Sequence, residues 1–359
     1  MTLARPLIVL PAGQDRLWRL HPAGRLEVLE DEPALEVPVT GERASGSVQN
    51  SAGWLVVAVQ EGRGLQVFRI EAGRIERRLF LSVPPGYQVL CCVVRGSTLF
   101  AGGSMTSGEP WPHDTIALLR GDLAASDCAL QPIPLPPEVL GLRKAIDDLA
   151  IIDNELVALD DIVIPKFILR FDLADLPDLR YLGRESFAHG TYESAHRLVA
   201  GDGWAAVLSS TIGMGGSSRH VALWLMPYWR PVAVLSLHHP MFGGGSTSSE
   251  EWPRIAGLGD WLLVESTTRG VGAVNVPGLL ARWRRTEPLD KEGHRRPMGL
   301  DPEADVTWFE SWGGPITGID DTLLLATSSG ALALLDDSAI HQRVAAHHPD
   351  GETPGAPPD

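Results

Sequence analysis

Short apolar stretches alternate with turn-forming residues along nearly the whole chain, and one unit of this pattern recurs. In each copy a Gly, Asp or Asn turn precedes a short apolar strand, which a polar or glycine-rich loop connects to a second, alternating strand. The three clearest copies occupy residues 50–73, 199–226 and 256–278. Four further copies cover residues 6–30, 93–123, 151–173 and 318–337. Self-similarity of this kind is the signature of a repeat architecture.

The spacing of the copies predicts four strands in each repeat. The second strands are expected to begin at Trp54, Thr98, Glu155, Trp204, Trp261 and Thr322, which are 44 to 61 residues apart. A propeller blade of four strands takes roughly 40–50 residues, and longer loops account for the surplus. A short strand precedes each copy, and an outer strand follows, as in 74–83 and 230–239. Because no stretch shows a convincing 3.6-residue period, we predict an all-β fold, a seven-bladed β-propeller of four-stranded antiparallel sheets.

Composition and edge chemistry agree with this fold. The 38 Gly and 28 Pro among 359 residues favour many short elements separated by turns. Radial repetition packs each sheet on its neighbours and leaves only short outer edges exposed. We expect one propeller domain over residues 1–346, closed by a strand near 6–11 or by a strand at 339–346. The Pro-rich acidic segment 347–359 is predicted to be a disordered tail.

The repeated units resemble the β-propeller superfamily over nearly the whole chain. The resemblance is architectural, because the GH…WD pair of WD40 blades and the double glycine of kelch repeats are missing. Divergent propellers of this type occur in bacterial operons beside ATPases and other partners, which implies a place in a bacterial multi-component system. The resemblance also implies that one face carries the long loops. In a propeller, the loops that join the second strand to the third and the loops that lead into the inner strands lie on the same face. These loops cover residues 102–114, 160–166, 188–196, 209–220, 238–252 and 308–315.

Charge and cysteine content exclude several classes of protein. The chain carries 30 basic and 45 acidic residues, a net charge of −15, which disfavours binding to nucleic acid and to anionic membranes. The three cysteines Cys91, Cys92 and Cys128 form no disulfide pattern, and two of them lie in an apolar run typical of a core. The N-terminal stretch is too short for a signal peptide, and no apolar run could span a membrane. We therefore expect a cytoplasmic protein.

Polar residues on the predicted inner strands are the candidate catalytic groups. They are His196, Glu193, Tyr192, Asp147, Asp148 and Arg254. His196 beside Glu193 and Tyr192 is typical of an acid–base group, with a structural channel histidine as the alternative. Asp147 and Asp148 could bind a cation, with a solvated turn as the alternative. A four-histidine iron site, as in carotenoid-cleaving oxygenases, is disfavoured because His196 alone among the four candidates lies convincingly on an inner strand. We expect no metal and no cofactor.

Tryptophans suggest a second kind of site. They make up 11 of the 23 aromatic residues. Trp54, Trp204 and Trp261 occupy one repeat position, which predicts core packing. Other indoles and arginines lie in or beside the predicted face loops, and together they have the composition of a binding surface: Trp111, Trp252, Trp308, Trp312, Arg143, Arg254 and Arg269. The alternative is that these indoles plug the channel mouth or anchor their own loops.

The sequence therefore supports one principal hypothesis on function and two alternatives. The principal hypothesis is a non-catalytic interaction scaffold that presents the loop-rich face to a protein partner. The first alternative is an enzyme, a hydrolase, lyase or isomerase, with its site at the mouth of the channel. The second is a binder of a small molecule or glycan. Phosphate-cradling GxxxxGK[ST], GxSxG and HExxH motifs are all missing, so no motif names a reaction.

Overall fold

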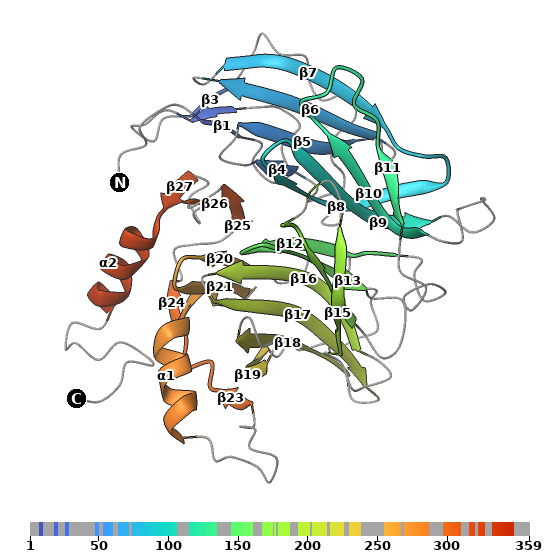
Figure 1. Cartoon of the computed structure of the whole chain (residues 1–359). Coiled ribbons are helices and arrows are strands. Elements are labelled where there is room, and N and C mark those ends of the chain that lie inside the picture. Colours follow the sequence, from blue (N-terminus) through green and yellow to red (C-terminus); the bar gives the residue numbers. More distant parts are fainter. Residues whose placement is uncertain are drawn as a thin grey trace. The chain divides into compact units, whose positions relative to one another are not determined.

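The structure is a computed structural model, and strands are its main elements (Figure 1). It describes residues 7–9, 18–20, 26–28, 47–49, 53–59, 64–71, 74–105, 115–134, 145–160, 167–174, 176, 179–186, 193–201, 203–213, 216–225, 230–237, 255–266, 269–286, 297–309, 316–319, 322–326 and 332–347. The chain divides into two compact units, Met1–His189 and Gly190–Asp359, and each unit is described by itself.

The described strands of the first unit form four antiparallel sheets, each arranged in chain order. A three-stranded sheet comprises β1 (Leu7–Val9), β2 (Trp18–Leu20) and β3 (Leu26–Val28). Next comes the sheet of β4 (Ser47–Gln49), β5 (Trp54–Val59), β6 (Gly64–Glu71) and β7 (Arg74–Ser82). The third sheet holds β8 (Tyr87–Arg95), β9 (Thr98–Met105), β10 (Thr115–Asp122) and β11 (Gln131–Pro134). The fourth holds β12 (Asp148–Ile152), β13 (Glu155–Asp160), β14 (Phe167–Asp172) and β15 (Arg180–Ser186).

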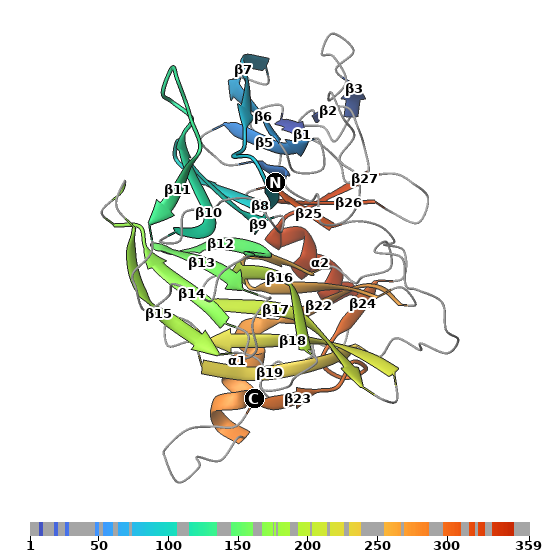
Figure 2. The same cartoon turned by 90° about the vertical axis from the view of Figure 1, so that its right-hand side faces the viewer.

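The described strands of the second unit form three sheets (Figure 2). Five strands make the first: β16 (Glu193–Gly201), β17 (Trp204–Gly213), β18 (Gly216–Leu225), β19 (Arg230–Leu237) and β23 (Met298–Leu300), which joins β19 in parallel. The second contains β20 (Ile255–Leu258), β21 (Trp261–Ser266), β22 (Gly270–Asn275) and β24 (Thr307–Phe309). The third contains β25 (Ile316–Ile319), β26 (Thr322–Ala326) and β27 (Leu332–Leu335).

The predicted strand positions are confirmed. Strands β5, β9, β13, β17, β21 and β26 begin at Trp54, Thr98, Glu155, Trp204, Trp261 and Thr322, the expected residues. Two-residue turns connect several first and second strands, because Arg95 pairs with Thr98 and Ile152 pairs with Glu155. The first turn residue has a positive φ in both, 58° at Gly96 and 52° at Asp153. Gly and Asp tolerate this backbone geometry, so the turn residues explain where these hairpins reverse.

Apolar faces of neighbouring sheets pack on one another within each unit. Inner strands β4, β8 and β12 contact in sequence in the first unit, and β16, β20 and β25 do so in the second. The three repeat tryptophans are buried, as predicted: Trp54 between the second and third sheets of the first unit, and Trp204 in the core shared by the first two sheets of the second unit. Trp261 lies under a helix instead. Cys91 and Cys92 are buried and form no disulfide.

Two helices correct the strand-only prediction. Helix α2 (Asp337–His347) replaces the closing strand expected at 339–346, and helix α1 (Val276–Thr286) follows β22 directly. Both helices begin with a side-chain cap, because Asn275 Oδ1 accepts the Gly278 N–H at 2.8 Å and Asp336 Oδ1 accepts the Ala339 N–H at 2.7 Å. Ile340 of α2 is fully buried against the sheet of Trp261. Neither described helix has the length and apolarity to cross a membrane.

Candidate active site

The Asp147–Asp148 pair stands at the start of inner strand β12, and the backbone around it is held on two sides. The Ile146 N–H donates to Gly103 O of β9 at 2.8 Å, and the Asp147 N–H donates to Leu159 O of β13 at 2.9 Å. Ala145 also forms a β-bridge with Ser104. These two consecutive N–H groups point in opposite directions, as they do in an extended backbone. The segment that carries both carboxylates is therefore anchored between two sheets.

The two carboxylates differ in exposure. Leu149 and Ile151 of β12, and Ile146 just before it, belong to the apolar cluster between the sheets of β8–β11 and β12–β15. Asp147 stands between Ile146 and the strand and is half-buried. Asp148 is only 4% exposed; its Oδ1 accepts the Leu149 N–H at 3.0 Å. Asp147 is therefore the accessible member of the pair.

Asp148 stands at a repeat position that other sheets fill with different residues. Asp148 pairs with Leu159, four residues after β13 begins, and Cys91 of the preceding sheet pairs with Gly102, four residues after β9 begins. Arg197 pairs with Leu208, four residues after β17 begins, so it holds the same position in the second unit. Cys91 and Asp148 are buried, although a carboxylate is costly to bury. A charged residue thus occupies this position in two of the three sheets, and Asp148 is the buried one.

The uncharged side chains of Gln88 and Ser104 complete the polar groups at this end of the sheets. Gln88 near the start of β8 pairs directly with Ser104 near the end of β9. Ser104 lies four residues after Phe100, a member of the same inter-sheet cluster, so both residues of the pair face the sheet of β12. Gln88 is exposed and Ser104 is half-buried. Sequence reasoning missed this pair, because only the register and the bridge from Ser104 to Ala145 bring it near the segment that carries Asp147.

The other predicted catalytic residues belong to the second unit. Glu193 begins β16, and His196 occupies a β-bulge between the Ala195–Ser209 and Arg197–Leu208 pairs. Leu90 stands at the same kind of bulge in β8, between the Val89 and Cys91 pairs. The bulge is therefore a feature of the repeat and not of a histidine site alone. Tyr192 and Arg254 lie outside the described residues.

The predicted tryptophan surface is placed only in part. Trp308 lies in β24, the outermost strand of its sheet, and not in a loop, so its predicted position was wrong. Its Nε1 donates to Pro302 O at 2.7 Å, and the Arg269 guanidinium lies 5.6 Å from the ring centroid. Arg269 also forms an ion pair with Glu303 at 2.6 Å. Both side chains thus contact each other and the segment that leads into β24. Outside the described residues lie Trp111, Trp252, Trp312, Arg143 and Arg254.

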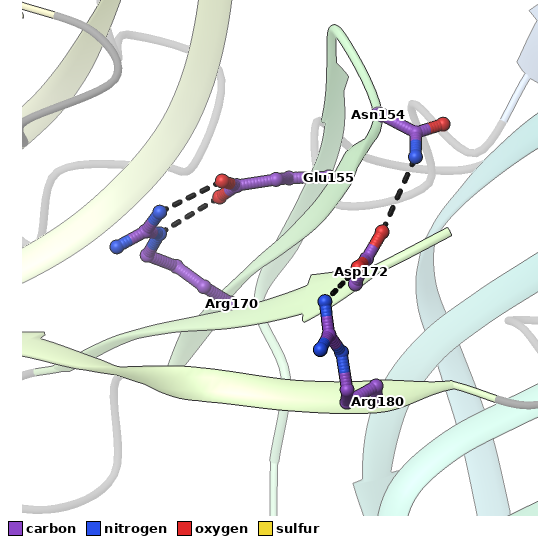
Figure 3. A network of polar contacts seen from close by, with 5 residues as sticks. All are labelled: Asn154, Glu155, Arg170, Asp172 and Arg180. Atoms are coloured by element: carbon purple, nitrogen blue, oxygen red, sulfur yellow. Dashed lines mark hydrogen bonds and ion pairs between the residues drawn. The ribbon is translucent and has the colours of Figure 1, made fainter. Parts of the chain in front are cut away.

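A charged network lies at the opposite end of the β12–β15 sheet (Figure 3). Arg170 donates two hydrogen bonds to Glu155, at 2.7 and 2.8 Å. Asp172 accepts from Asn154 and Arg180. The Ala174 N–H, together with Arg180, holds the pKa of the Asp172 carboxyl below its usual value. Arg95 of β8 donates to Asn154, so the network joins two sheets. Arg170 and Arg180 pair with carboxylates. Arg95 instead binds the Asn154 carboxamide, and its buried Nη1 has no hydrogen-bond partner among the described residues.

No metal cluster accompanies these groups in the described ranges, where no three His, Cys, Asp or Glu side chains gather so as to hold an ion. The chemistry that Asp147 offers on its own is proton transfer. A half-buried carboxylate on a rigid strand can take a proton from water or substrate. Neutral hydrogen-bonding groups beside it can orient a bound molecule.

Comparison with known proteins supports the fold. No family model and no curated protein matches the sequence. Hydrazine synthase from Kuenenia stuttgartiensis matches with a TM-score of 0.58 and 14% identity, over 93% of each chain. A "putative 6-phosphogluconolactonase" from Bacteroides fragilis matches with a TM-score of 0.51 and 12% identity, over 94% of this chain and 96% of that one. One of the same description from Bacteroides uniformis has a TM-score of 0.51 and 14% identity, over 93% and 95%.

These matches and the succession of antiparallel sheets define the chain as a β-propeller. They also correct the principal hypothesis on function. The three matched structures carry the names of enzymes. This finding contradicts the prediction of a non-catalytic interaction scaffold and favours the enzyme alternative.

Proposed function

We propose that this chain is a seven-bladed β-propeller hydrolase, folded as one domain over residues 1–346, that opens a lactone or a related ester. The observation that carries the proposal is the Asp147–Asp148 pair, anchored at the start of β12 by backbone bonds to β9 and β13. Two of the matched structures are named as putative lactonases, which supports this choice of reaction. The three cysteines form no disulfide, which fits work in the reducing cytoplasm.

In this proposal Asp147 is the general base. Its carboxylate takes a proton from a water molecule while the water oxygen attacks the carbonyl carbon of the lactone. The tetrahedral intermediate then collapses as the bond between that carbon and the ring oxygen breaks. The proton passes from the Asp147 carboxyl to the departing alkoxide, so the products are an open-chain hydroxy acid and the regenerated carboxylate.

Asp148 is the positioning residue of the pair. Its Oδ1 binds the Leu149 N–H, the next group along β12, and its side chain is buried. This contact keeps the first residues of the strand in one conformation. Catalysis gains from such rigidity because a base must lie within hydrogen-bond reach of the proton it removes.

The first test is hydrolysis of a panel of small lactones and esters, followed by acid release at constant pH. Asp147→Asn keeps the shape of the side chain but removes the base, and we expect the rate to fall about 10²- to 10⁴-fold, the usual contribution of a general base. Asp153→Asn is the matched control, because Asp153 is exposed at the other end of β12 and Asn tolerates its positive φ.

Two outcomes contradict the proposal. One is a wild-type protein that hydrolyses no member of the panel. The other is Asp147→Asn that turns over as fast as Asp153→Asn. If His196→Ala loses turnover while Asp147→Asn keeps it, the general base is His196 of β16 instead.

A further inference from the structure

Strand β7 has the longest open edge among the described outer strands (Figure 1). An open edge carries backbone N–H and C=O groups that can pair with a further strand. Elsewhere the described edges are covered, interrupted or short. Strand β23 pairs with β19, β11 contains two prolines, and a bulge at Leu182 divides β15. The outermost strands β3, β24 and β27 have three or four residues each.

The edge of β7 is regular and rigidly held. Residues 77–82 pair with β6 in unbroken register, beyond a bulge at Glu76, and they include neither Pro nor Gly. Leu79 and Leu81 pack into the apolar cluster between this sheet and the next. Arg77 donates two hydrogen bonds, at 3.0 and 3.4 Å, to carbonyls of the turn that follows β10. The backbone groups along the edge are therefore fixed in position before any partner binds.

Side chains suited to an interface lie beside this edge. Phe80 is 45% exposed, and its ring lies across Gly64 of β6, where an added Cβ would come within 2.6 Å of the Phe80 Cζ atom. The Arg78 guanidinium lies 5.7 Å from the centroid of the Phe68 ring. Because alternate residues of a strand share a face, Arg78 and Phe80 stand together on the face away from the apolar cluster. Aromatic side chains and arginine are enriched in protein interfaces.

The charge of β7 selects the kind of partner. The strand carries Arg74, Arg77 and Arg78 against one glutamate, Glu76, although the chain as a whole has a net charge of −15. No described carboxylate forms an ion pair with these three arginines. A second copy of β7 would add like charge, which destabilises paired strands. We infer that β7, in a role separate from the proposed hydrolysis, binds an extended acidic segment of a partner protein, which joins the sheet as an additional strand.

Two synthetic peptides of equal length and charge serve as probes, and fluorescence anisotropy measures their binding to the full chain. EVEVTEVE can form a strand, whereas the two central prolines of EVEPPEVE remove backbone donors and prevent it. We expect EVEVTEVE to bind with a Kd that rises with salt concentration. EVEPPEVE should bind at least about 10-fold more weakly, because main-chain hydrogen bonds supply the affinity of an added strand.

Two variants test the side chains beside the edge. Arg78→Glu reverses a charge and Phe80→Ala removes the exposed ring, and each should raise the Kd of EVEVTEVE about 10-fold. Their matched controls are Arg285→Glu, at an exposed arginine of α1, and Leu182→Ala, at the other exposed large apolar side chain among the described residues. Both controls should keep the wild-type Kd, and circular dichroism should show all four variants folded.

Four results contradict the binding of an acidic strand at β7. One is a wild type that binds neither peptide, and another is equal binding of the two peptides. The third is a Kd that both Arg78→Glu and Phe80→Ala leave unchanged. The fourth is a wild-type dimer that Phe80→Ala splits into monomers in analytical ultracentrifugation, which would assign this edge to a second copy of the chain.

Discussion

At the scale of single residues, Trp204 shows how the repeat secures its core. Its indole is 1% exposed, and its Nε1 donates to Gly259 O at 3.3 Å. Two glycines make room for the ring: a Cβ on Gly201 would lie 2.2 Å from it, and one on Gly257 would lie 3.2 Å from it. The packing of the Trp204 ring therefore depends on glycine at both positions.

Trp204→Ala is expected to lower the free energy of unfolding by about 3–5 kcal/mol, because it leaves a large cavity in a closed core. Chemical denaturation followed by circular dichroism measures the change. Trp308→Ala is the control, since the half-buried Trp308 packs only at the edge of its sheet, and its loss should be smaller. Equal losses for the two variants would contradict this account of the core.

At the scale of elements, helix α2 depends on the residue that precedes it. Asp336 accepts the Ala339 N–H, and its backbone carbonyl accepts the Ile340 N–H at 3.1 Å. The capping bond lowers the pKa of the Asp336 carboxyl, because a charged carboxylate accepts the N–H more strongly. Ile340 and Val344, one turn apart, then bury against the sheet of Trp261. The Asp336 cap thus fixes where helix α2, and with it the apolar face of Ile340 and Val344, begins.

Asp336→Ala should cost about 0.5–2 kcal/mol of stability at pH 7, the usual value of an N-cap. Because the folded-state pKa is lowered, the stabilisation is present above the unfolded pKa of about 3.9 and is lost as the pH falls through the folded value. Thermal unfolding of both proteins between pH 7 and pH 2 should therefore show a difference in Tm that shrinks toward acid. Asp336→Asn, another good cap, should recover much of the loss at pH 7. A difference in Tm independent of pH would refute the role of the carboxylate.

At the scale of the whole molecule, antiparallel strand pairing dominates. The described strands form seven sheets, and apolar clusters join neighbouring sheets within each unit. The likeness to solved propellers extends over more than nine-tenths of the chain. Such an architecture contains little helix, and the described part holds two helices of 11 residues each.

Far-UV circular dichroism of the intact protein should accordingly show a β spectrum, with helix well under a quarter of the residues. A helical content near the one-third typical of globular proteins would contradict the propeller assignment. The measurement needs no variant, and it reports on the whole chain.

The sequence by itself determined the strands, their turns and the buried tryptophans. Alternation of apolar and polar positions is a local property, and turn residues such as Gly96 and Asp153 mark the reversals, so the starts of β5, β9 and β17 could be read directly. The helices were missed although Asn275 and Asp336 stand as caps. Helix α2 carries little helical periodicity, whereas α1 follows the helical period but opens on Pro277 and Gly278, residues typical of a turn. Only the tertiary structure decided that Trp308 lies in an outer strand, because its partner strand is more than 30 residues away. The same reason governs the candidate site: Gln88, Ser104 and Asp147 come from three strands or their leading segments, and strand register alone brings them to one end of the sheets.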